Sequence, residues 1–392
     1  MMRSNILTRQ NDTTRMSSTT HKVENLVLPL ARARAKASVL PAAAVVEELQ
    51  CRVACALNIA PELVSIEGHR SDFPWVMLWC WGKAAGARLF AKVFLADPYP
   101  VPARFATPWE ELEGPANPQR PVEEQVSAEW NMIHEMRSRV GTQNIPAPLG
   151  RSFEDRTLVV EEVSGQRMDS FVNWRWPSRR KAHSVEEAML QAGSWLRTLH
   201  ESSFQGYETV DVSEALDALL ALARRRGAEL APYAGLARQV LESTRRDLNP
   251  RTALRVPVAL NHGDFSLPNL IWDDPKKRLW VIDFEHSGQR PIIHDLCTLI
   301  ATLRYRLLMP ITSPRVVRLL EEVFWKGYGP TGKEIRTLVN GLSCAWLFYH
   351  IFPRLSTLRA RRGWRGGLKA SLYKSLFQRF MIARILRAQQ NY

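Results

Sequence analysis

The stretch Asn261-His-Gly-Asp-Phe-Ser-Leu-Pro-Asn269, followed by Val281-Ile-Asp-Phe-Glu285, decides how this chain is interpreted. Between the two segments, short apolar runs flank the polar residues Asp273-Asp-Pro-Lys-Lys277, a pattern that predicts a β-hairpin. A hairpin returns the chain to its starting point, which brings its two ends together. An Asp in the first segment can then accept the proton of a hydroxyl group. The Asn and the Asp at the two ends of the hairpin can supply the oxygen ligands that Mg²⁺ prefers.

The residues His262-Gly-Asp264, Asn269 and Ile282-Asp-Phe-Glu285 together resemble the aminoglycoside phosphotransferase and choline kinase-like family. The resemblance implies that Asp264 is the catalytic residue, that Asn269 and Asp283 hold the metal, and that ATP and Mg²⁺ are the cofactors. Glu285 departs from the protein kinases, which have Gly there, although Ile-Asp-Phe-Glu is familiar in choline kinase-like members. Asp295 looks like the structural Asp that follows in the family.

The same resemblance implies an α+β protein kinase-like fold with two lobes. The N-lobe is expected to hold an antiparallel sheet with a helix, and the larger C-lobe to be mostly helical. We divide the chain into a disordered basic arm over residues 1–38, a nucleotide-binding N-lobe over 39–163 and a C-lobe over 164–392. The C-lobe would contain the catalytic loop and end in basic helices.

The expected N-lobe begins with a helix and continues with strands. Apolar spacing predicts a helix over 42–60 and strands over 63–67, 74–81, 88–95 and 156–163. Lys92 lies in the third strand between apolar residues, and burying an unpaired Lys is costly. It is either an edge-strand Lys that reaches solvent or, as the resemblance implies, the contact to the nucleotide's α- and β-phosphates. The link 68–74 stands where the fold has its nucleotide loop, so Ser71 is a candidate phosphate contact.

A helix is expected over 122–140, and the resemblance implies that a Glu on it pairs with the strand Lys. Glu129 is our choice, with Glu135 as the alternative. The segment 161–163 resembles the hinge between the lobes, where backbone groups would meet adenine. Beyond it, helical spacing predicts helices over 185–202, 212–222, 230–248, 292–307, 316–328, 333–352 and 367–388.

Composition bounds the remaining choices. The 392 residues carry a formal net charge of +14, and no Asp or Glu follows Glu334. Such a one-sided basic segment favours anionic partners, among them an anionic membrane surface. No apolar run is long enough to span a membrane, and the five scattered cysteines suit free, mostly buried thiols. We therefore expect a cytoplasmic protein, with a peripheral position at the inner face of the membrane as the alternative.

The acceptor is expected to be a hydroxyl group of a small molecule. Because aminoglycosides are polycations, an enzyme that binds them should offer carboxylates, whereas this chain ends in a basic tail. A sugar or a lipid-linked glycan precursor fits better. The alternatives are a pseudokinase that acts as a nucleotide-binding regulatory module, and an aminoglycoside-type antibiotic kinase. Nucleic acid is not an expected partner, since no helix-turn-helix, zinc or RNA-binding motif is present.

Overall fold

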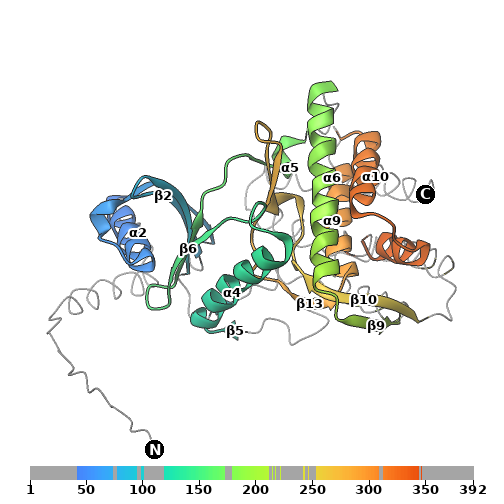
Figure 1. Ribbon diagram of the computed structural model, residues 1–392, viewed down its shortest axis with the longest axis horizontal. Helices are drawn as coiled ribbons and strands as arrows, with labels where there is room; N and C mark the ends of the chain where they lie inside the picture. Colours follow the sequence, from blue (N-terminus) through green and yellow to red (C-terminus); the bar gives the residue numbers. More distant parts are fainter. Residues whose placement is uncertain are drawn as a thin grey trace, which may run out of the picture. The chain divides into compact units, whose positions relative to one another are not determined.

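The computed structural model describes residues 42–73, 77–94, 99–100, 119–172, 179–211, 253–308 and 312–343, with a few isolated positions between and after them (Figure 1). The chain forms two compact units, Met1–Glu48 and Leu49–Tyr392. The expected arm at 1–38, most of the helices expected over 212–222 and 230–248, and the expected basic helix at 367–388 lie outside the described residues.

The first sheet has five strands in the order β1-β2-β3-β7-β6, and every neighbouring pair is antiparallel. Its strands are β1 (Val64–Phe73), β2 (Met77–Ala84), β3 (Ala87–Phe94), β6 (Pro148–Ser152) and β7 (Thr157–Glu161), preceded by α2 (Ala42–Leu57) and the 3₁₀ turn η2 (Pro61–Leu63). Helix α4 (Val122–Val140), which contacts β6 and β7, begins and ends where the sequence predicts. The short strands β4 (Tyr99–Pro100) and β5 (Gln119–Arg120) pair with each other.

The first strand is longer than predicted, which corrects the link expected at 68–74. Residues 68–73 belong to β1, whose pairing with β2 continues through two register irregularities to Phe73. Only a glycine fits at position 68, because a Cβ there would lie 2.5 Å from the Trp81 ring. Without a side chain at that position, the strand passes under the indole instead of turning. Ser71 therefore lies on a strand, opposite Leu78.

The second half of the described chain is mostly helical. It contains β8 (Gln166–Arg167), α5 (Met168–Phe171), α6 (Arg179–Ser202), β9 (Gly206–Val210), β10 (Leu254–Asn261), η4 (Leu267–Asn269), β11 (Leu270–Asp273), β12 (Arg278–Val281), β13 (Gly288–Pro291), α9 (Ile293–Tyr305), η5 (Arg306–Leu308) and α10 (Pro314–Tyr328). Helix α6 lies against α10, and α9 contacts both α10 and β10 (Figure 1). Residues 333–343 are also helical. None of the described helices is long and apolar enough to cross a membrane.

Two small sheets flank residues 261–285. Strands β11 and β12 form the predicted hairpin, and β8 extends it on the other side of β11. Strand β10 pairs with β13 and β9 in a second sheet, which the sequence analysis did not anticipate. The hairpin brings Leu270 opposite Val281, so the residues just outside them, Asn269 and Ile282, are neighbours. The backbone N–H of Ile282 donates to the carbonyl of Asn269 at 3.1 Å.

The cysteines differ from expectation in one respect. Cys51, Cys55, Cys80 and Cys297 form no disulfide, as expected, but Cys51 and Cys55 are exposed, while Cys80 and Cys297 are buried. The prediction of mostly buried thiols is therefore wrong for the two on α2. They lie one turn apart on the outer face of that helix, whose buried face is formed by Leu49, Val53 and Ala56.

The tip of the hairpin is stabilised by Asp274. Its carboxylate accepts hydrogen bonds from Lys277 Nζ at 2.7 Å, from Ser184 and from Trp272 Nε1 at 3.1 Å. These bonds, with that from Lys277 the largest, lower the pKa of Asp274 to about 2. An Asp in an unfolded chain has a pKa of about 3.9, which is higher than the pKa in the folded protein. The contribution of Asp274 to stability is therefore fully present above that pH and is lost as the pH falls towards 2.

We therefore expect Asp274→Asn to lower the Tm at pH 7, and the difference in Tm from the unmodified protein to become smaller as the pH falls below about 4. Thermal unfolding of both proteins between pH 7 and pH 3 measures the difference. The effect should be modest, because the side chain is 47% exposed and solvent screens the charge. Glu62→Gln, which removes an exposed carboxylate in the first turn of η2, is the control. A Tm difference that stays constant with pH would contradict the assignment.

Candidate functional site

The loop after β10 holds Asp264 and Asn269 side by side. The Asn269 amide Nδ2 donates to Asp264 Oδ2 at 2.9 Å and to the Asp264 backbone carbonyl at 2.9 Å. The turn of η4 between them brings the two side chains together, since the backbone N–H of Asn269 donates to the Ser266 carbonyl. Because the amide nitrogen is directed at Asp264, the amide oxygen of Asn269 remains as an acceptor for another group.

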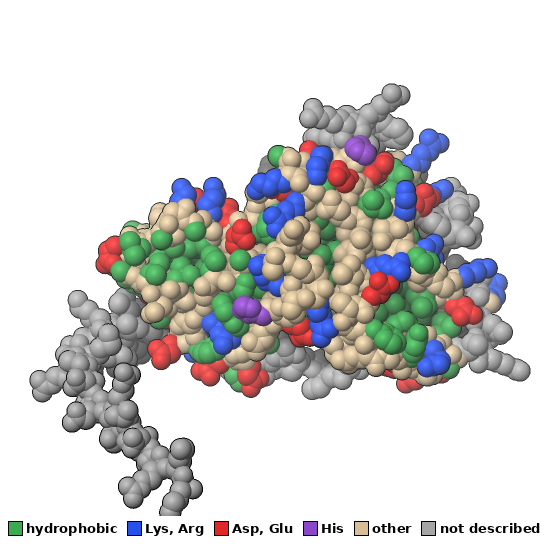
Figure 2. Space-filling view, in the orientation of Figure 1, with side chains coloured by type: hydrophobic (Ala, Val, Ile, Leu, Met, Phe, Trp, Pro, Cys, Tyr) green, Lys and Arg blue, Asp and Glu red, His purple; other side chains and the backbone are tan. Residues whose placement is uncertain are grey.

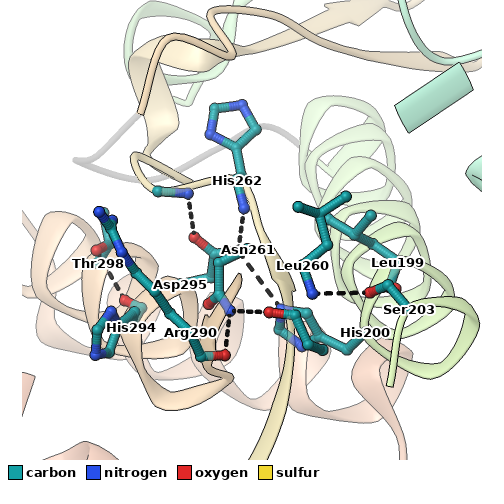
Figure 3. Close-up of polar contacts among 12 residues, drawn as sticks. Leu199, His200, Ser203, Leu260, Asn261, His262, Arg290, His294, Asp295 and Thr298 are labelled. Carbon is teal, nitrogen blue, oxygen red and sulfur yellow. Dashed lines mark hydrogen bonds and ion pairs between the residues drawn. The ribbon is translucent and has the colours of Figure 1, made fainter. Parts of the chain in front are cut away.

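Asp295 fixes the backbone of this loop. It is fully buried at the first turn of α9, and its two carboxylate oxygens accept the backbone N–H groups of His262 at 2.7 Å and Gly263 at 2.9 Å (Figure 3). His200 Nε2 lies 3.5 Å from the same carboxylate. Hydrogen bonds from two successive N–H groups to one carboxylate set the orientation of the peptide that precedes Asp264. Asp295 thus occupies the structural position expected from the sequence.

Replacing Asp295 with Asn should destabilise the fold and the loop together. An amide offers one oxygen where two N–H groups need acceptors, so one N–H would face an NH₂ group. We expect a loss of about 1–3 kcal/mol in unfolding free energy, the usual cost of an unsatisfied buried donor, and a lower kcat. Urea unfolding and steady-state kinetics measure the two effects. An unchanged stability would contradict the assigned hydrogen bonds.

Gly263 allows the loop to approach the segment after β12. Its φ is +86°, and a Cβ at this position would lie 1.9 Å from the carbonyl oxygen of His286. Both the left-handed backbone and the close approach exclude a side chain there. The glycine beside Asp264 is therefore a steric requirement of this loop.

His262 connects the two halves of the site. Its Nε2 lies 3.0 Å from the carbonyl oxygen of Ile282, which can only accept, so Nε2 carries the proton. The other ring nitrogen, Nδ1, then accepts the backbone N–H of Asp264 at 3.3 Å. The fully buried imidazole therefore fixes the residue before Asp283 and the backbone of Asp264 at the same time.

An ion cluster around Lys92 forms the second part of the site. Lys92 Nζ lies 2.6 Å from Glu129 Oε1 on α4, 2.5 Å from Asp283 Oδ1 and 3.9 Å from Glu285 Oε2. Lys92 is 8% exposed and Glu129 2%. The alternative partner, Glu135, instead pairs with Arg139 on the same helix at 2.9 Å. The structure therefore brings residues from β3, α4 and the end of the hairpin to one point.

The pKa values of these groups reflect burial and mutual charge. Burial alone would lower the pKa of Lys92, but Asp283, Glu129 and Glu285 outweigh it and hold that pKa well above its usual value. Burial raises the pKa of Glu129, and Lys92 offsets this only in part. Burial would also raise the pKa of Asp283, but the attraction of the Lys92 ammonium outweighs this effect, so the pKa of Asp283 is lowered. The pKa of Asp264 is raised, mainly by burial and also by the charge of Asp283.

The donor set suits a hard divalent cation. The described residues contain no group of three or more His, Cys, Asp or Glu side chains arranged to hold a metal. A magnesium ion in a nucleotide site, however, commonly takes one or two protein oxygens and completes its shell with phosphates and water. The Asn269 amide oxygen and the Asp283 carboxylate are such a pair. Three carboxylates lie around the Lys92 ammonium, so acidic groups outnumber basic ones at this point and a divalent cation would be favoured there.

Asp283 adopts an unusual backbone. Its φ is +72°, in the left-handed region that Asp and Asn tolerate better than most residues. Non-glycine residues in this region tend to occur where the surrounding structure imposes the conformation, often at functional sites. Here β12, His262 and Lys92 determine the position on three sides.

Two contributions to this arrangement were not inferred from the sequence. Glu285 was noted only as a departure from protein kinases, yet its side chain is 11% exposed and lies near Lys92. The place of His262 as a link between Asp264 and Ile282 was also missed. A signal existed for Glu285, because it stands only two residues after Asp283 in the sequence. Ser71 has no described side-chain environment, so its contact with a nucleotide stays a prediction.

Residues 114–331, more than half of the chain, match the phosphotransferase enzyme family (APH). The chain belongs to this family. The phosphotransferase is thus a small-molecule kinase that acts on hydroxyl acceptors, and its α+β two-lobe, protein kinase-like fold is the one expected from the sequence.

Several solved structures resemble the phosphotransferase remotely. A choline/ethanolamine kinase family protein from Mesorhizobium loti is 16% identical, with 87% of this chain and 97% of that chain covered and a TM-score of 0.48. Spectinomycin phosphotransferase, in complex with ADP and spectinomycin, is 11% identical with coverages of 83% and 93% and a TM-score of 0.46. Choline kinase LicA from Streptococcus pneumoniae is 15% identical with coverages of 84% and 96% and a TM-score of 0.41. No curated protein matches the chain.

Proposed function

We propose that the phosphotransferase transfers the γ-phosphate of ATP to a hydroxyl group in a Mg²⁺-dependent reaction. The observation that carries the proposal is the position of Lys92 Nζ, which lies 2.6 Å from Glu129 Oε1 and 2.5 Å from Asp283 Oδ1. These two acids are 37 and 191 residues away from Lys92 in the sequence. Removing a Lys and its carboxylate partners from water costs free energy that their mutual attraction need not offset. Such a buried cluster is therefore better explained by a role in binding than by stability. A nucleotide phosphate is the ligand that we assign to this role.

Each residue then has a defined task. Lys92, oriented by Glu129, binds the α- and β-phosphates, and Ser71 on β1 contacts the phosphates from the sheet. Asp264 orients the acceptor hydroxyl and takes its proton as the new bond to phosphorus forms. Its raised pKa makes it a better proton acceptor than an exposed carboxylate. Asn269 and Asp283 hold Mg²⁺, which when bound neutralises charge on the phosphates.

We propose a neutral or anionic acceptor, such as a sugar or a lipid-linked glycan precursor. Several acidic side chains of the described helical part are already paired with bases: Asp169 with Arg167, Glu187 with Lys277, Glu201 with Arg197, and Glu321 with Arg304. Figure 2 shows Lys and Arg interspersed with Asp and Glu on the face drawn, with no large acidic area. These four paired carboxylates are therefore less available to attract a polycationic antibiotic.

A transfer experiment tests the proposal. Purified protein is incubated with γ-labelled ATP, Mg²⁺ and an extract of the source cell separated into aqueous and lipid fractions, with Asp264→Asn as the control. Label that depends on Asp264 should enter a small molecule in one fraction. Label in the aqueous fraction identifies a soluble acceptor, and label in the lipid fraction a lipid-linked one. Protein that binds Mg·ATP but labels neither fraction would overturn the proposal.

A further inference from the structure

Buried polar side chains connect the end of α10 with the loop that holds Asp264. The Tyr328 hydroxyl, at the last residue of α10, lies 2.8 Å from His200 Nδ1 on α6. On the other side of the imidazole, His200 Nε2 lies 3.5 Å from Asp295 Oδ2 on α9 (Figure 3). The same oxygen accepts the backbone N–H of His262 at 2.7 Å. Contacts between buried groups thus join three helices to the catalytic loop.

The surrounding groups determine the direction of these contacts. Both oxygens of Asp295 accept backbone N–H groups, so the carboxylate faces the imidazole as an acceptor and His200 Nε2 carries the proton. In a neutral imidazole the other nitrogen, Nδ1, then accepts a hydrogen bond from the Tyr328 hydroxyl. Burial raises the pKa of Tyr328, and the charge of Asp295 adds to this effect, so the hydroxyl keeps its proton. The contact between His200 and Asp295 is longer than the two backbone hydrogen bonds, so it assists the orientation of the carboxylate and does not set it alone.

Close packing of α6 against α10 fixes the place of Tyr328. A Cβ at Gly193 on α6 would lie 2.3 Å from the carbonyl oxygen of Phe324 on α10. A Cβ at Gly327 on α10 would lie 2.1 Å from the carbonyl oxygen of Leu190 on α6. The two helix backbones therefore approach more closely than any side chain at these positions would allow. Because Tyr328 directly follows Gly327, this approach sets the distance from its backbone to α6.

The Tyr328 hydroxyl is separable from the packing of its ring. The ring meets the imidazole of His200 edge-on, with the ring centroids 5.8 Å apart. Its centroid also lies 6.0 Å from the rings of Phe324 and Trp325. A phenyl ring would keep all three contacts. The hydrogen bond to His200 is therefore a further feature of this position, which the packing of the ring does not need.

We propose that Tyr328 is a positioning residue for phosphate transfer. Its hydroxyl holds the His200 ring with Nε2 facing Asp295, and Asp295 orients the peptide that precedes Asp264. The inference rests on the proposed function and extends its machinery to the end of α10. Because Tyr328 acts through two other side chains, it affects the alignment of Asp264 and leaves the proton transfer itself to that carboxylate.

Tyr328→Phe tests the proposal, because it removes the hydroxyl and keeps the ring. The maximal rate of Asp264-dependent label transfer in the cell-extract fraction should fall about 3- to 10-fold, the range that corresponds to one lost hydrogen bond. The KM for ATP should stay within about twofold, because Lys92 and Glu129 lie on other elements. Tyr207→Phe, which makes the same change at a tyrosine that is 57% exposed, is the matched control and should alter neither value.

Two measurements that need no transfer show whether the loop is affected. Hydrogen exchange of the His262 and Gly263 amides, which donate to Asp295, should become about 3- to 10-fold faster in Tyr328→Phe. The nitrogen NMR signals of the His200 ring, assigned by their loss in His200→Gln, should show the proton on Nε2 in the unmodified protein. In Tyr328→Phe the proton should be distributed between the two ring nitrogens.

A double variant tests the route through Asp295. If Tyr328 acts through that carboxylate, adding Tyr328→Phe to Asp295→Asn should slow transfer by less than about twofold beyond Asp295→Asn alone. Effects that multiply would show that Tyr328 acts by another route, and they would overturn the proposal.

Three further results would overturn it. The first is transfer by Tyr328→Phe within about twofold of that by Tyr207→Phe, and the second is slower transfer with unchanged exchange of both amides. The third is a proton on Nδ1 of His200 in the unmodified protein, which needs no variant. Failure of the proposed function is distinct, because the unmodified protein would then transfer no Asp264-dependent label, while the exchange rates and ring signals would still report on the contact.

Discussion

Asp264→Asn is expected to lower kcat by about 10³-fold, within the range by which a positioned general base contributes to catalysis. Asn has the same shape as Asp and can still meet the Asn269 amide, but it cannot take the proton of the acceptor hydroxyl. The KM for ATP and the binding of Mg·ATP should remain within about twofold, because Lys92, Glu129 and Asp283 are untouched. The ratio of kcat to KM separates these effects.

Single-turnover experiments measure the rate of phosphate transfer. A fluorescent ATP analogue measures nucleotide binding in a separate titration. Asp217→Asn, which makes the same chemical change at an exposed position, should behave as the unmodified protein. If transfer by Asp264→Asn survives near its original rate, Asp264 is not the proton acceptor. If nucleotide binding is lost as well, the residue acts through the loop structure.

Asp283→Asn is expected to raise the Mg²⁺ concentration needed for half-maximal activity by about 10–100-fold, at least the effect of removing a group that supports a metal ligand. Asn tolerates the left-handed backbone at this position, so the substitution removes the charge without strain. Lys92 keeps Glu129 as a partner, and the fold should survive.

Titration of activity with Mg²⁺ at fixed ATP measures the change, and circular dichroism checks the fold. Asp283→Ala makes a useful comparison, because it removes the same ligand and adds the cost of an Ala at φ +72°. The two variants should share the magnesium defect and differ in stability. An unchanged magnesium requirement in both would remove Asp283 from the metal site.

Local pattern was sufficient for the elements that form from neighbouring residues. Helix α4 has the predicted bounds, and the β11–β12 hairpin follows from two apolar runs around a polar turn. Pairing between distant segments was not predictable in the same way. Strand β10 joins β9 and β13, whose residues lie up to about 50 positions away and include Gly and Pro at the paired ends. Such pairing depends on tertiary packing more than on local propensity.

For the site, the sequence identified residue types and spacing but left the choice between Glu129 and Glu135 open, although its pattern favours one of them. Glu129 and Glu135 are both on α4, and only the first lies on its apolar face. That face is formed by Val122, Val126, Ile133 and Met136, which are all buried. An acid within an apolar stripe at helical spacing must be paired, which favours Glu129 over Glu135. The closed arrangement around Lys92 could not be read from the chain, because it joins three separate elements.

The 191-residue separation between Lys92 and Asp283 has a consequence for how the protein is made. A ribosome adds about 5–20 residues per second, so roughly 10–40 s pass between the synthesis of the two residues. During that interval Glu129, only 37 residues from Lys92, is already present and can neutralise it. The nascent first sheet can therefore bury its Lys as a balanced pair. Asp283 and Glu285 join only when the second half of the chain arrives, so the group of carboxylates around Lys92 is completed last.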